Sequence, residues 1–347
     1  MPSLPNDGAA QARSVGLTYV GDETPGYRRV RRGSGFSYVA PDGVIAEGAE
    51  RSRIAALAIP PAWQEVWIST DETSHLQATG YDDAGRKQYI YHPRWEHVRD
   101  QAKFDRLGDF AQRLVALRKC VDGQLRRPGL DRAKVVALAV AVLDETLIRV
   151  GNRRYARDND TYGLTTLKPE HVEVQGTHVL LDFVGKGGSE QQHVFRDRRI
   201  ARLISQCRDL SGETLFTYET IDGLAQIAST DVNEYLAAST GTGFTAKDFR
   251  IWGATTTVAR ALASGTMGST GKSAEDEAGS PARDRLLEAI DSAAERIGNT
   301  RAVCRSAYVH PVLPEAFEGG ALTHAWKRSR SGRWLDRAES TVRYLLQ

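Results

Sequence analysis

The stretch DRAKVVALAVAVLDETLIRVGN, residues 131–152, indicates a helix at the centre of a folded domain. Its middle is almost entirely apolar, and a helix that is hydrophobic on all sides is usually buried in a core. The helix should end near Arg149 and Gly151, because glycine is common just beyond helix C-termini. At such a junction, an arginine most simply meets the carbonyl groups of the last helical turn.

The segments on both sides of this helix predict a mainly helical domain that contains a small sheet. The sequence KFDRLGDFAQRLVALRKCVDGQL, residues 103–125, has the spacing of a second helix. The sequence HVEVQGTHVLLDFVGKGGSEQQHVF, residues 171–195, alternates between apolar and polar residues and contains two glycine turns. This pattern predicts three antiparallel strands, with Lys186 at the tip of a hairpin. From about residue 197 the pattern is again mostly helical.

The beginning of the chain has a different pattern, with short strands from about residue 26 to 92. GFSYVAPDGVIA contains an Asp-Gly turn between two apolar stretches, and EVWIST, HLQATGYD and GRKQYIYH are further short alternating segments. The pattern changes to long helical periods near residue 95. We therefore expect an α+β protein with a small β-rich domain at residues 1–95 and a larger helical domain at residues 96–347.

Composition and charge leave the class of partner open. The 347 residues are 41% hydrophobic and 26% charged, with a net charge of +2, which is ordinary for a globular protein. Basic residues cluster at 28–32, 153–157 and 327–333. Such clusters can form a phosphate-binding surface, although each cluster alone is more simply a solvated face.

The sequence argues against a metal site, a membrane or secreted location and a phosphate-binding loop. The three cysteines are far apart and the eight histidines form no HExxH pair, so we expect no metal site and a reduced, cytoplasmic protein. No signal peptide is evident, and no apolar run approaches the roughly 20 residues that span a bilayer. GTMGSTGKS, residues 265–273, resembles a phosphate loop but has Thr266 where the first glycine is required. We interpret it as a surface linker.

A tyrosine follows a predicted helix in RIGNTRAVCRSAYVHP, residues 296–311. The preceding residues have helical spacing, and Gly298 with Asn299 should end that helix. Tyr308 then lies beyond the end of the helix, among basic and polar residues. It is either a packed tyrosine whose hydroxyl is hydrogen-bonded or a nucleophile.

A further pair of basic residues begins a predicted helix in AKDFRIWGATT, residues 246–256. Lys247 and Arg250 lie in its first turns, where Arg250 could simply stack on Trp252 or pair with Asp248. Together with the residues above, however, they form a chemical set. Two arginines can neutralise a phosphodiester, a lysine can protonate a leaving oxygen, and a tyrosine can attack phosphorus.

Four segments occur in an order that resembles a known family. LIRVGN, DFVGKGG, KDFRIWGA and GNTRAVCRSAY resemble the boxes of type IB DNA topoisomerases, specifically their compact poxvirus and bacterial branch. GRKQYIYH and YARDNDTYGLTTL resemble further segments of that branch. The resemblance covers most of residues 60–312, and four boxes in order are specific although any one alone is weak. It implies a DNA-clamp domain at residues 1–95 and a tyrosine recombinase-like catalytic fold at residues 96–347.

The resemblance also implies the residues of the site. Its five catalytic positions fall on Arg149, Lys186, Arg250, Asn299 and Tyr308. Its DNA contacts fall on Gln88, Tyr89, Tyr91, Tyr155, Thr161 and Lys247. Asn299 departs from the histidine of viral and nuclear members and cannot titrate near neutral pH, so we expect it to donate a hydrogen bond to phosphate. Gly187 replaces an acidic residue expected in the viral branch.

The implied activity is relaxation of positive and negative supercoils through a transient 3′-phosphotyrosyl link. It needs no ATP and no Mg²⁺ for chemistry, and it implies a monomer that clamps double-stranded DNA in a bacterial nucleoid, with no membrane partner. A tyrosine recombinase is the first alternative, but recombinases typically have His-x-x-Arg where this chain has Lys247-Asp-Phe-Arg250. The second alternative is a DNA-binding protein without chemistry, in which Tyr308 is a core residue.

Overall fold

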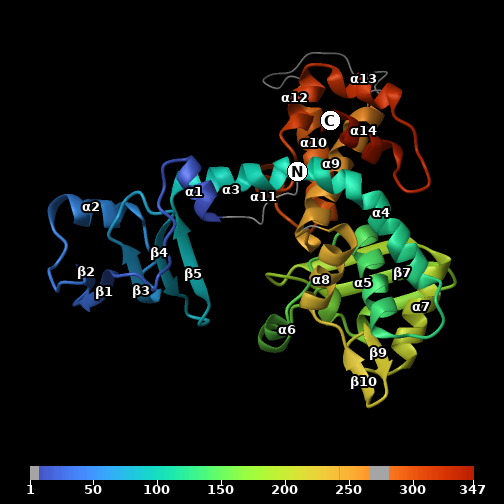
Figure 1. The fold of residues 1–347 in the computed structure, drawn as a ribbon, viewed down its shortest axis with the longest axis horizontal. Helices are drawn as coiled ribbons and strands as arrows, with labels where there is room; N and C mark the ends of the chain where they lie inside the picture. The colour runs from blue at the N-terminus through green and yellow to red at the C-terminus, as the bar shows by residue number, and fades with distance from the viewer. Residues whose placement is uncertain (1–7, 242, 266–280) are drawn as a thin grey trace. The chain divides into compact units, whose positions relative to one another are not determined.

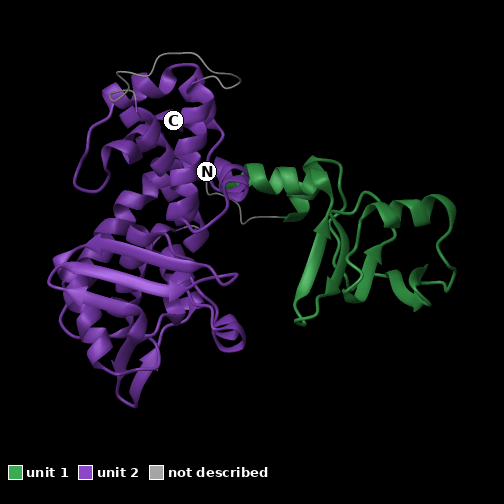
Figure 2. Cartoon of the chain, turned by 180° about the vertical axis from the view of Figure 1, so that it is seen from behind, with its two compact units in different colours: residues 1–103 green, residues 104–347 purple. Residues whose placement is uncertain are grey.

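The computed structural model describes residues 8–241, 243–265 and 281–347, which divide into two compact units (Figure 2). The first unit reaches Lys103 and the second begins at Phe104, whereas the sequence places the boundary at residue 95. The difference arises because helix α3 (Pro93–Asp105) packs its first turn into the first unit. There Trp95 is buried against Ala12 and Leu17.

The first unit is a five-stranded antiparallel sheet with two further helices besides most of α3 (Figure 1). Its strand order is β2-β1-β3-β4-β5, so β5 is an edge strand. The core is formed by Ile54 of the second helix and by Val66, Ile68 and Ala78 of the central strands. The elements are α1 (Gly8–Ser14), β1 (Gly26–Arg32), β2 (Gly35–Val39), α2 (Gly48–Ala56), β3 (Gln64–Ser69), β4 (Leu76–Tyr81) and β5 (Lys87–Tyr91).

Strand β1 is the basic cluster at residues 28–32, which the sequence analysis treats only as a charge cluster. It pairs with β2 through a turn in which Gly33 has a φ of +56°, a conformation that glycine adopts without strain. The Asp-Gly turn at Asp42 and Gly43 contributes only an isolated bridge between Val39 and Ile45. The strand before that turn therefore pairs mainly with β1.

The second unit is mainly helical, with α5 at its centre (Figure 1). Nearly every residue of α5 from Lys134 to Leu143 is buried, as its apolar sequence predicts. The helix expected at residues 103–125 is divided at Arg106 between α3 and α4. The helices of the unit are α4 (Leu107–Leu125), α5 (Arg132–Thr146), α6 (Arg153–Asn159), α7 (Arg198–Asp209), α8 (Ser229–Thr240), α9 (Ala246–Gly265), α10 (Pro281–Arg296), α11 (Arg301–Ala307), α12 (Val312–Glu318), α13 (Ala321–Arg328) and α14 (Arg337–Leu345).

A three-stranded antiparallel sheet lies within this helical unit, as predicted. Its order is β6-β7-β8, with β6 (Val172–Gln175), β7 (His178–Val184) and β8 (Glu190–Arg196). A second hairpin, β9 (Thr217–Thr220) with β10 (Gly223–Gln226), was not predicted. Its signal is present in the sequence as Asp222-Gly223, a turn dipeptide between two short stretches. The protein is thus a mixed helix and sheet structure with a small β unit and a helical unit.

Membrane-spanning helices and metal sites can be assessed only for the residues that the structure describes. Across residues 8–241, 243–265 and 281–347, no helix is both long and apolar enough to cross a membrane. Within those same ranges, no group of three His, Cys, Asp or Glu residues is arranged to hold a metal ion. Residues 266–273 of the segment that resembles a phosphate loop lie outside the described residues.

Candidate active site

Arg149 lies in a loop that begins where α5 ends. The helix ends at Thr146, earlier than expected, and Leu147 takes a left-handed conformation with a φ of +58°. The backbone carbonyl of Arg149 accepts a hydrogen bond from the Leu164 amide at 2.8 Å. A Cβ atom at Gly163 would lie 2.5 Å from that same carbonyl, so only glycine allows this approach. The loop is therefore held closely against residues 163–165.

Arg250 is buried at the start of α9, with 4% of its surface exposed. Its guanidinium donates hydrogen bonds to the carbonyls of Leu147 and Ile297, the second at 2.8 Å. It does not pair with Asp248, whose carboxylate instead accepts from the amide and hydroxyl of Thr245. The ion pair with Asp248 that the sequence suggested for Arg250 is therefore not formed, and Arg250 instead donates to backbone carbonyls.

Asn299 joins the two arginines. Its Oδ1 accepts a hydrogen bond from Arg149 Nη2 at 2.9 Å and another from Arg250 Nη2 at 2.7 Å. Because both partners can only donate, the oxygen of the amide must face them and the NH₂ group must face elsewhere. Arg149 also donates to the carbonyl of Gly298, so it meets the end of α10 and not the end of its own helix.

Tyr308 lies beside this pair, with the Arg250 Cζ atom 5.2 Å from the centre of its ring. The short helix α11, capped by Thr300, separates it from Asn299, whereas the sequence analysis placed the tyrosine directly after α10. Its carbonyl accepts a hydrogen bond from Thr255 Oγ1 at 3.2 Å, and the same hydroxyl accepts from the His310 amide at 3.1 Å. The backbone of Tyr308 is thus fixed to α9.

The electrostatics of the site favour an anion. The hydrogen bonds of Arg149 and Arg250 described above all go to neutral amide oxygens, and no carboxylate forms an ion pair with either arginine in the described parts of the chain. Burial, together with the charge of Arg149, lowers the pKa of Arg250 to about 10. Arg250 Nε is buried and has no hydrogen-bond partner among the described residues. Since a buried cation without a counter-ion is costly, the pair suits a phosphate group.

Lys186 lies on the β7–β8 turn, as predicted, and is exposed. Gly187 and Gly188 both take left-handed conformations there, with φ of +80° and +76°. The hairpin lies next to the arginine pair, because a Cβ atom at Gly298 would be 2.4 Å from Gln191 Oε1. Arg149, Arg250, Asn299 and Tyr308 are therefore brought together, while Lys186 lies on a neighbouring hairpin.

The candidate DNA contacts of the second unit are accessible. Tyr155 of α6 is 41% exposed, so its ring is not packed in the core. Thr161 Oγ1 donates a long hydrogen bond, 3.5 Å, to the carbonyl of Tyr155. Lys247 is exposed in the first turn of α9. All three side chains can therefore be reached by a ligand.

The candidate DNA contacts of the first unit lie on the edge strand β5. Tyr89 and Tyr91 stack with their ring centres 5.9 Å apart. Side chains alternate along a strand, so Gln88 lies on the opposite face, where its Nε2 donates to Asp82 at 2.8 Å. The three predicted contacts thus do not share one face of the sheet.

Some residues near the site were missed by the sequence analysis. Thr255 belongs to a run of three threonines in α9, which carries no signal of a role beside Tyr308. His193 of β8 has a buried Nε2 without a partner in the described ranges. Burial, with the charges of Arg250 and Arg296, lowers the pKa of His193 to about 4, so its ring is neutral at pH 7. Its proximity to Arg250 depends on the fold and has no sequence signature.

Two family models match the chain. Residues 92–316 match the catalytic core of eukaryotic DNA topoisomerase I, and residues 35–82 match the N-terminal domain of bacterial DNA topoisomerase IB. The two matches lie in order. The first includes the five predicted catalytic positions and Tyr155, Thr161 and Lys247, whereas Gln88, Tyr89 and Tyr91 lie between the two matched ranges.

Individual proteins are also similar. A DNA topoisomerase 1B of Acanthamoeba polyphaga mimivirus is 32% identical over 271 residues, which is 77% of this chain and 79% of the relative. The DNA topoisomerase 1B of vaccinia virus (strain Copenhagen) is 28% identical over 164 residues, 46% of this chain and 50% of the relative. A DNA topoisomerase 1 of Daucus carota is 30% identical over 132 residues, 37% of this chain and 16% of the relative.

Proposed function

The chain belongs to the type IB DNA topoisomerase family, and on that premise we propose how its site cuts and rejoins DNA. One observation carries the proposal: two arginines with neutral hydrogen-bond partners lie beside Tyr308. They offer positive charge to one phosphate of double-stranded DNA, next to a phenol that can attack it. The helical unit would then have the tyrosine recombinase-like catalytic fold.

In the proposed reaction, Tyr308 Oη attacks a backbone phosphorus and forms a 3′-phosphotyrosyl bond. The bond from phosphorus to the 5′-oxygen breaks, and religation reverses the step. A neutral phenol is a weak nucleophile, so Tyr308 needs nearby positive charge to stabilise its phenolate form. Arg149 and Arg250 supply this charge and also stabilise the negative charge that develops on the phosphate oxygens. Since the energy of the phosphodiester is kept in the new bond, no ATP is required.

Asn299 has a second part in this scheme besides the expected donation to phosphate. Its Oδ1 holds the two guanidinium groups at a common point, and its NH₂ group remains able to donate to a phosphate oxygen. A histidine in this position could titrate, whereas asparagine holds the pair in the same way at every pH. Asn299 therefore orients the arginines and does not move a proton.

Lys186 is the proposed general acid. The departing 5′-oxygen would otherwise leave as an alkoxide, and a lysine on a glycine-containing turn can move to reach it. The role has a direct test: Lys186→Ala should slow cleavage of normal DNA but not of DNA with a 5′-thiolate leaving group, which needs no proton. Equal slowing of both substrates would remove Lys186 from this role.

The partner in the proposal is one DNA duplex that a monomer clamps with both units. Tyr89 and Tyr91 contribute from β5, while Tyr155, Thr161 and Lys247 contribute from the helical unit. Gln88 would have to leave Asp82 to reach a base. The enzyme would act on chromosomal DNA in a bacterial cytoplasm and would require no Mg²⁺ for chemistry.

The deciding experiment is relaxation of supercoiled plasmid in EDTA and without ATP, comparing the natural chain with Tyr308→Phe. We expect the natural chain to relax both positive and negative supercoils and to form a covalent protein–DNA adduct, and the variant to do neither. Binding without relaxation by both proteins would favour a recombinase or a DNA-binding protein. An active phenylalanine variant would remove Tyr308 as the nucleophile.

A further inference from the structure

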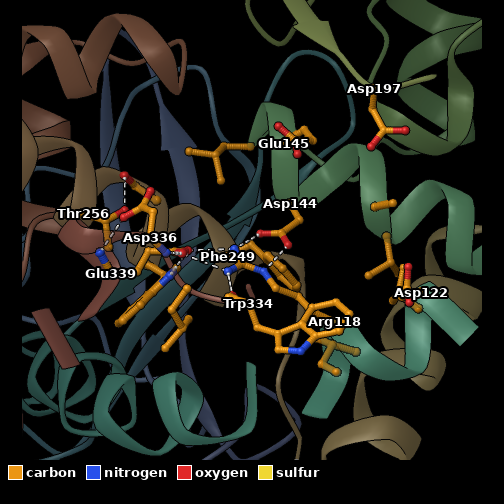
Figure 3. A pocket seen from close by; sticks show the side chains of 18 of the residues that line it. Arg118, Asp122, Asp144, Glu145, Asp197, Phe249, Thr256, Trp334, Asp336 and Glu339 are labelled. Carbon is orange, nitrogen blue, oxygen red and sulfur yellow. Dashed lines mark hydrogen bonds and ion pairs between the residues drawn. The ribbon is translucent and has the colours of Figure 1, made fainter. Parts of the chain in front are cut away.

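A largely buried group of charged residues connects α14 to α5 and α9, the helices next to Arg149 and Arg250. Its centre is Arg118 of α4, which lines a cavity of about 460 Å³ (Figure 3). Arg118 Nε and Nη2 donate to the two oxygens of Asp144 at 2.6 and 2.8 Å. Its Nη1 and Nη2 also donate to Glu339 of α14, at 2.9 and 2.7 Å. A last hydrogen bond goes to the carbonyl of Trp334.

Glu339 is buried, with 7% of its surface exposed, yet both of its oxygens are fully matched. Besides Arg118, they accept from Trp252 Nε1 at 3.1 Å and from the Asp336 amide at 2.9 Å. A buried ion pair is favourable only when its geometry is good and its remaining lone pairs are satisfied, as they are here. We call Arg118, Asp144, Trp252 and Glu339 the Arg118 cluster.

Two members of the cluster, Asp144 and Trp252, lie on the helices next to the active-site arginines. Asp144 is in the last turn of α5, just before the loop of Arg149. Trp252 lies just after Arg250 in α9 and, because side chains rotate about 100° per residue, it projects from another side of the helix. One side of α9 thus meets the cluster while another side meets Tyr308.

Leu147 connects these two sides. The Leu147 carbonyl accepts a hydrogen bond from Arg250. Its side chain packs so closely on Gly253 that a Cβ atom there would lie 2.2 Å from Leu147 Cδ1. A shift of α5 relative to α9 must therefore move Leu147, and with it both the start of the Arg149 loop and the guanidinium of Arg250.

We propose that the Arg118 cluster positions Arg149 and Arg250 for the reaction, and that the segment from Trp334 to Leu345 is required for this reason. Arg118 and Glu339 do not touch the DNA in this proposal. They are positioning residues that act through α5 and α9. The proposal rests on the proposed function, because DNA cleavage is its readout.

The test must separate positioning from simple stabilisation. Apolar residues of similar size often replace a whole buried ion cluster without loss of stability, whereas removal of one partner leaves a buried charge alone. The triple variant Arg118→Met/Asp144→Leu/Glu339→Leu therefore removes all of the charges at once. If the cluster only holds the fold together, this variant should be folded and fully active.

We expect the triple variant to melt within a few degrees of the natural chain and to bind DNA equally well. Its single-turnover cleavage should be slower by about a hundredfold, since a displacement of roughly 1 Å in a site can cost that much. The loss should be the same with a 5′-thiolate leaving group, because the arginines and not the general acid are displaced. Cleavage at the natural rate by the folded triple variant would overturn the proposal.

A second variant decides the question if the triple variant does not fold. Glu339→Gln keeps the shape and one acceptor oxygen, so we expect a folded protein and a loss of about tenfold in cleavage rate, on the scale of one hydrogen bond. An unchanged rate in this variant would equally overturn the proposal. Arg132→Met is the matched control, since it removes an ion pair with Asp231 at the opposite end of α5 and should cleave normally.

The outcomes also separate this inference from the proposed function. If the natural chain forms no covalent adduct with DNA, the proposed function fails and the positioning role fails with it. If the natural chain cleaves DNA and both cluster variants cleave at the same rate, the positioning role alone is refuted.

Discussion

Arg118, which is partly buried, and Arg250, which is buried, belong to one unit, and their surroundings are opposite. Arg118 lies between two carboxylates, whereas the acceptors around Arg250 are neutral amide oxygens. Burial alone would lower the pKa of Arg118, but Asp144 and Glu339 raise it above its usual value. The pKa of Arg250 instead stays depressed by burial and by Arg149.

The same side chain can thus hold helices together in one place and remain available to an anion in another. A cation that is matched by carboxylates has no remaining affinity for an anion and can only organise the fold. A cation that is buried without a counter-ion costs free energy, and this cost is recovered when a phosphate arrives. Sites of function are expected to be destabilised in this way.

The largest expected effect is a loss of stability when Arg118, the arginine paired with carboxylates, is removed. Arg118→Ala leaves the buried Glu339 and the partly buried Asp144 without their cation, which should destabilise the protein by about 3–5 kcal/mol. Urea unfolding followed by circular dichroism measures this change. Arg132→Ala, at a half-exposed ion pair, should cost under about 1 kcal/mol and serves as the control. Equal losses of unfolding free energy in the two variants would show that Arg118 is no more important to stability than a surface cation.

The next effect is a loss of DNA cleavage when Arg250, the arginine without a carboxylate partner, is removed. Arg250→Ala should slow single-turnover DNA cleavage by about 10²–10³, the usual scale for one lost donor to a transition state. Arg250→Lys should not restore the rate, because lysine lacks the planar fork of donors. The free energy of unfolding should fall much less than in Arg118→Ala. A loss of cleavage below about threefold would remove Arg250 from the site.

A smaller effect concerns the binding of a simple oxyanion. Sulfate should stabilise the natural chain against thermal unfolding by about 1.4 kcal/mol when its concentration is roughly ten times its dissociation constant. The same salt should stabilise Arg250→Ala less, since the unmatched cation is gone. Chloride at equal ionic strength is the control. Identical stabilisation of both proteins would show that the arginine pair does not attract an anion.

The smallest effect is the response of the matched cluster to acid. Burial alone would raise the pKa of Glu339, but Arg118, the Asp336 amide and Trp252 hold it below its usual value. The stability that it contributes is therefore present above about pH 5 and is lost as the pH falls through the lowered pKa. Glu339→Gln should show a shallower fall of melting temperature between neutral and acid pH. A fall as steep as that of the natural chain would show that Glu339 is not held as a charged group.

Much of the helical unit could be predicted because its signals are local. The apolar run of α5, the alternation of β6 to β8 and the position of Arg250 at a helix start follow from periodicity and turn residues. The predictions that failed concern element boundaries that depend on tertiary packing. Arg106 interrupts a continuous helical pattern, and the first turn of α3 joins the first unit because Trp95 packs there. The DNA contacts on β5 remain predictions, and Gln88 faces away from Tyr89.

Sequence patterns were enough for most of the element order, for the family resemblance and for naming the candidate site residues. Only the tertiary structure decided how those residues meet, because Arg149 and Asn299 are far apart in the chain and their hydrogen bond depends on how α5, α9 and α10 pack. Packing also decided which arginine has a counter-ion. Arg118 and Arg250 look alike in the sequence, and only their neighbours in space make one a structural cation and the other a candidate site for phosphate.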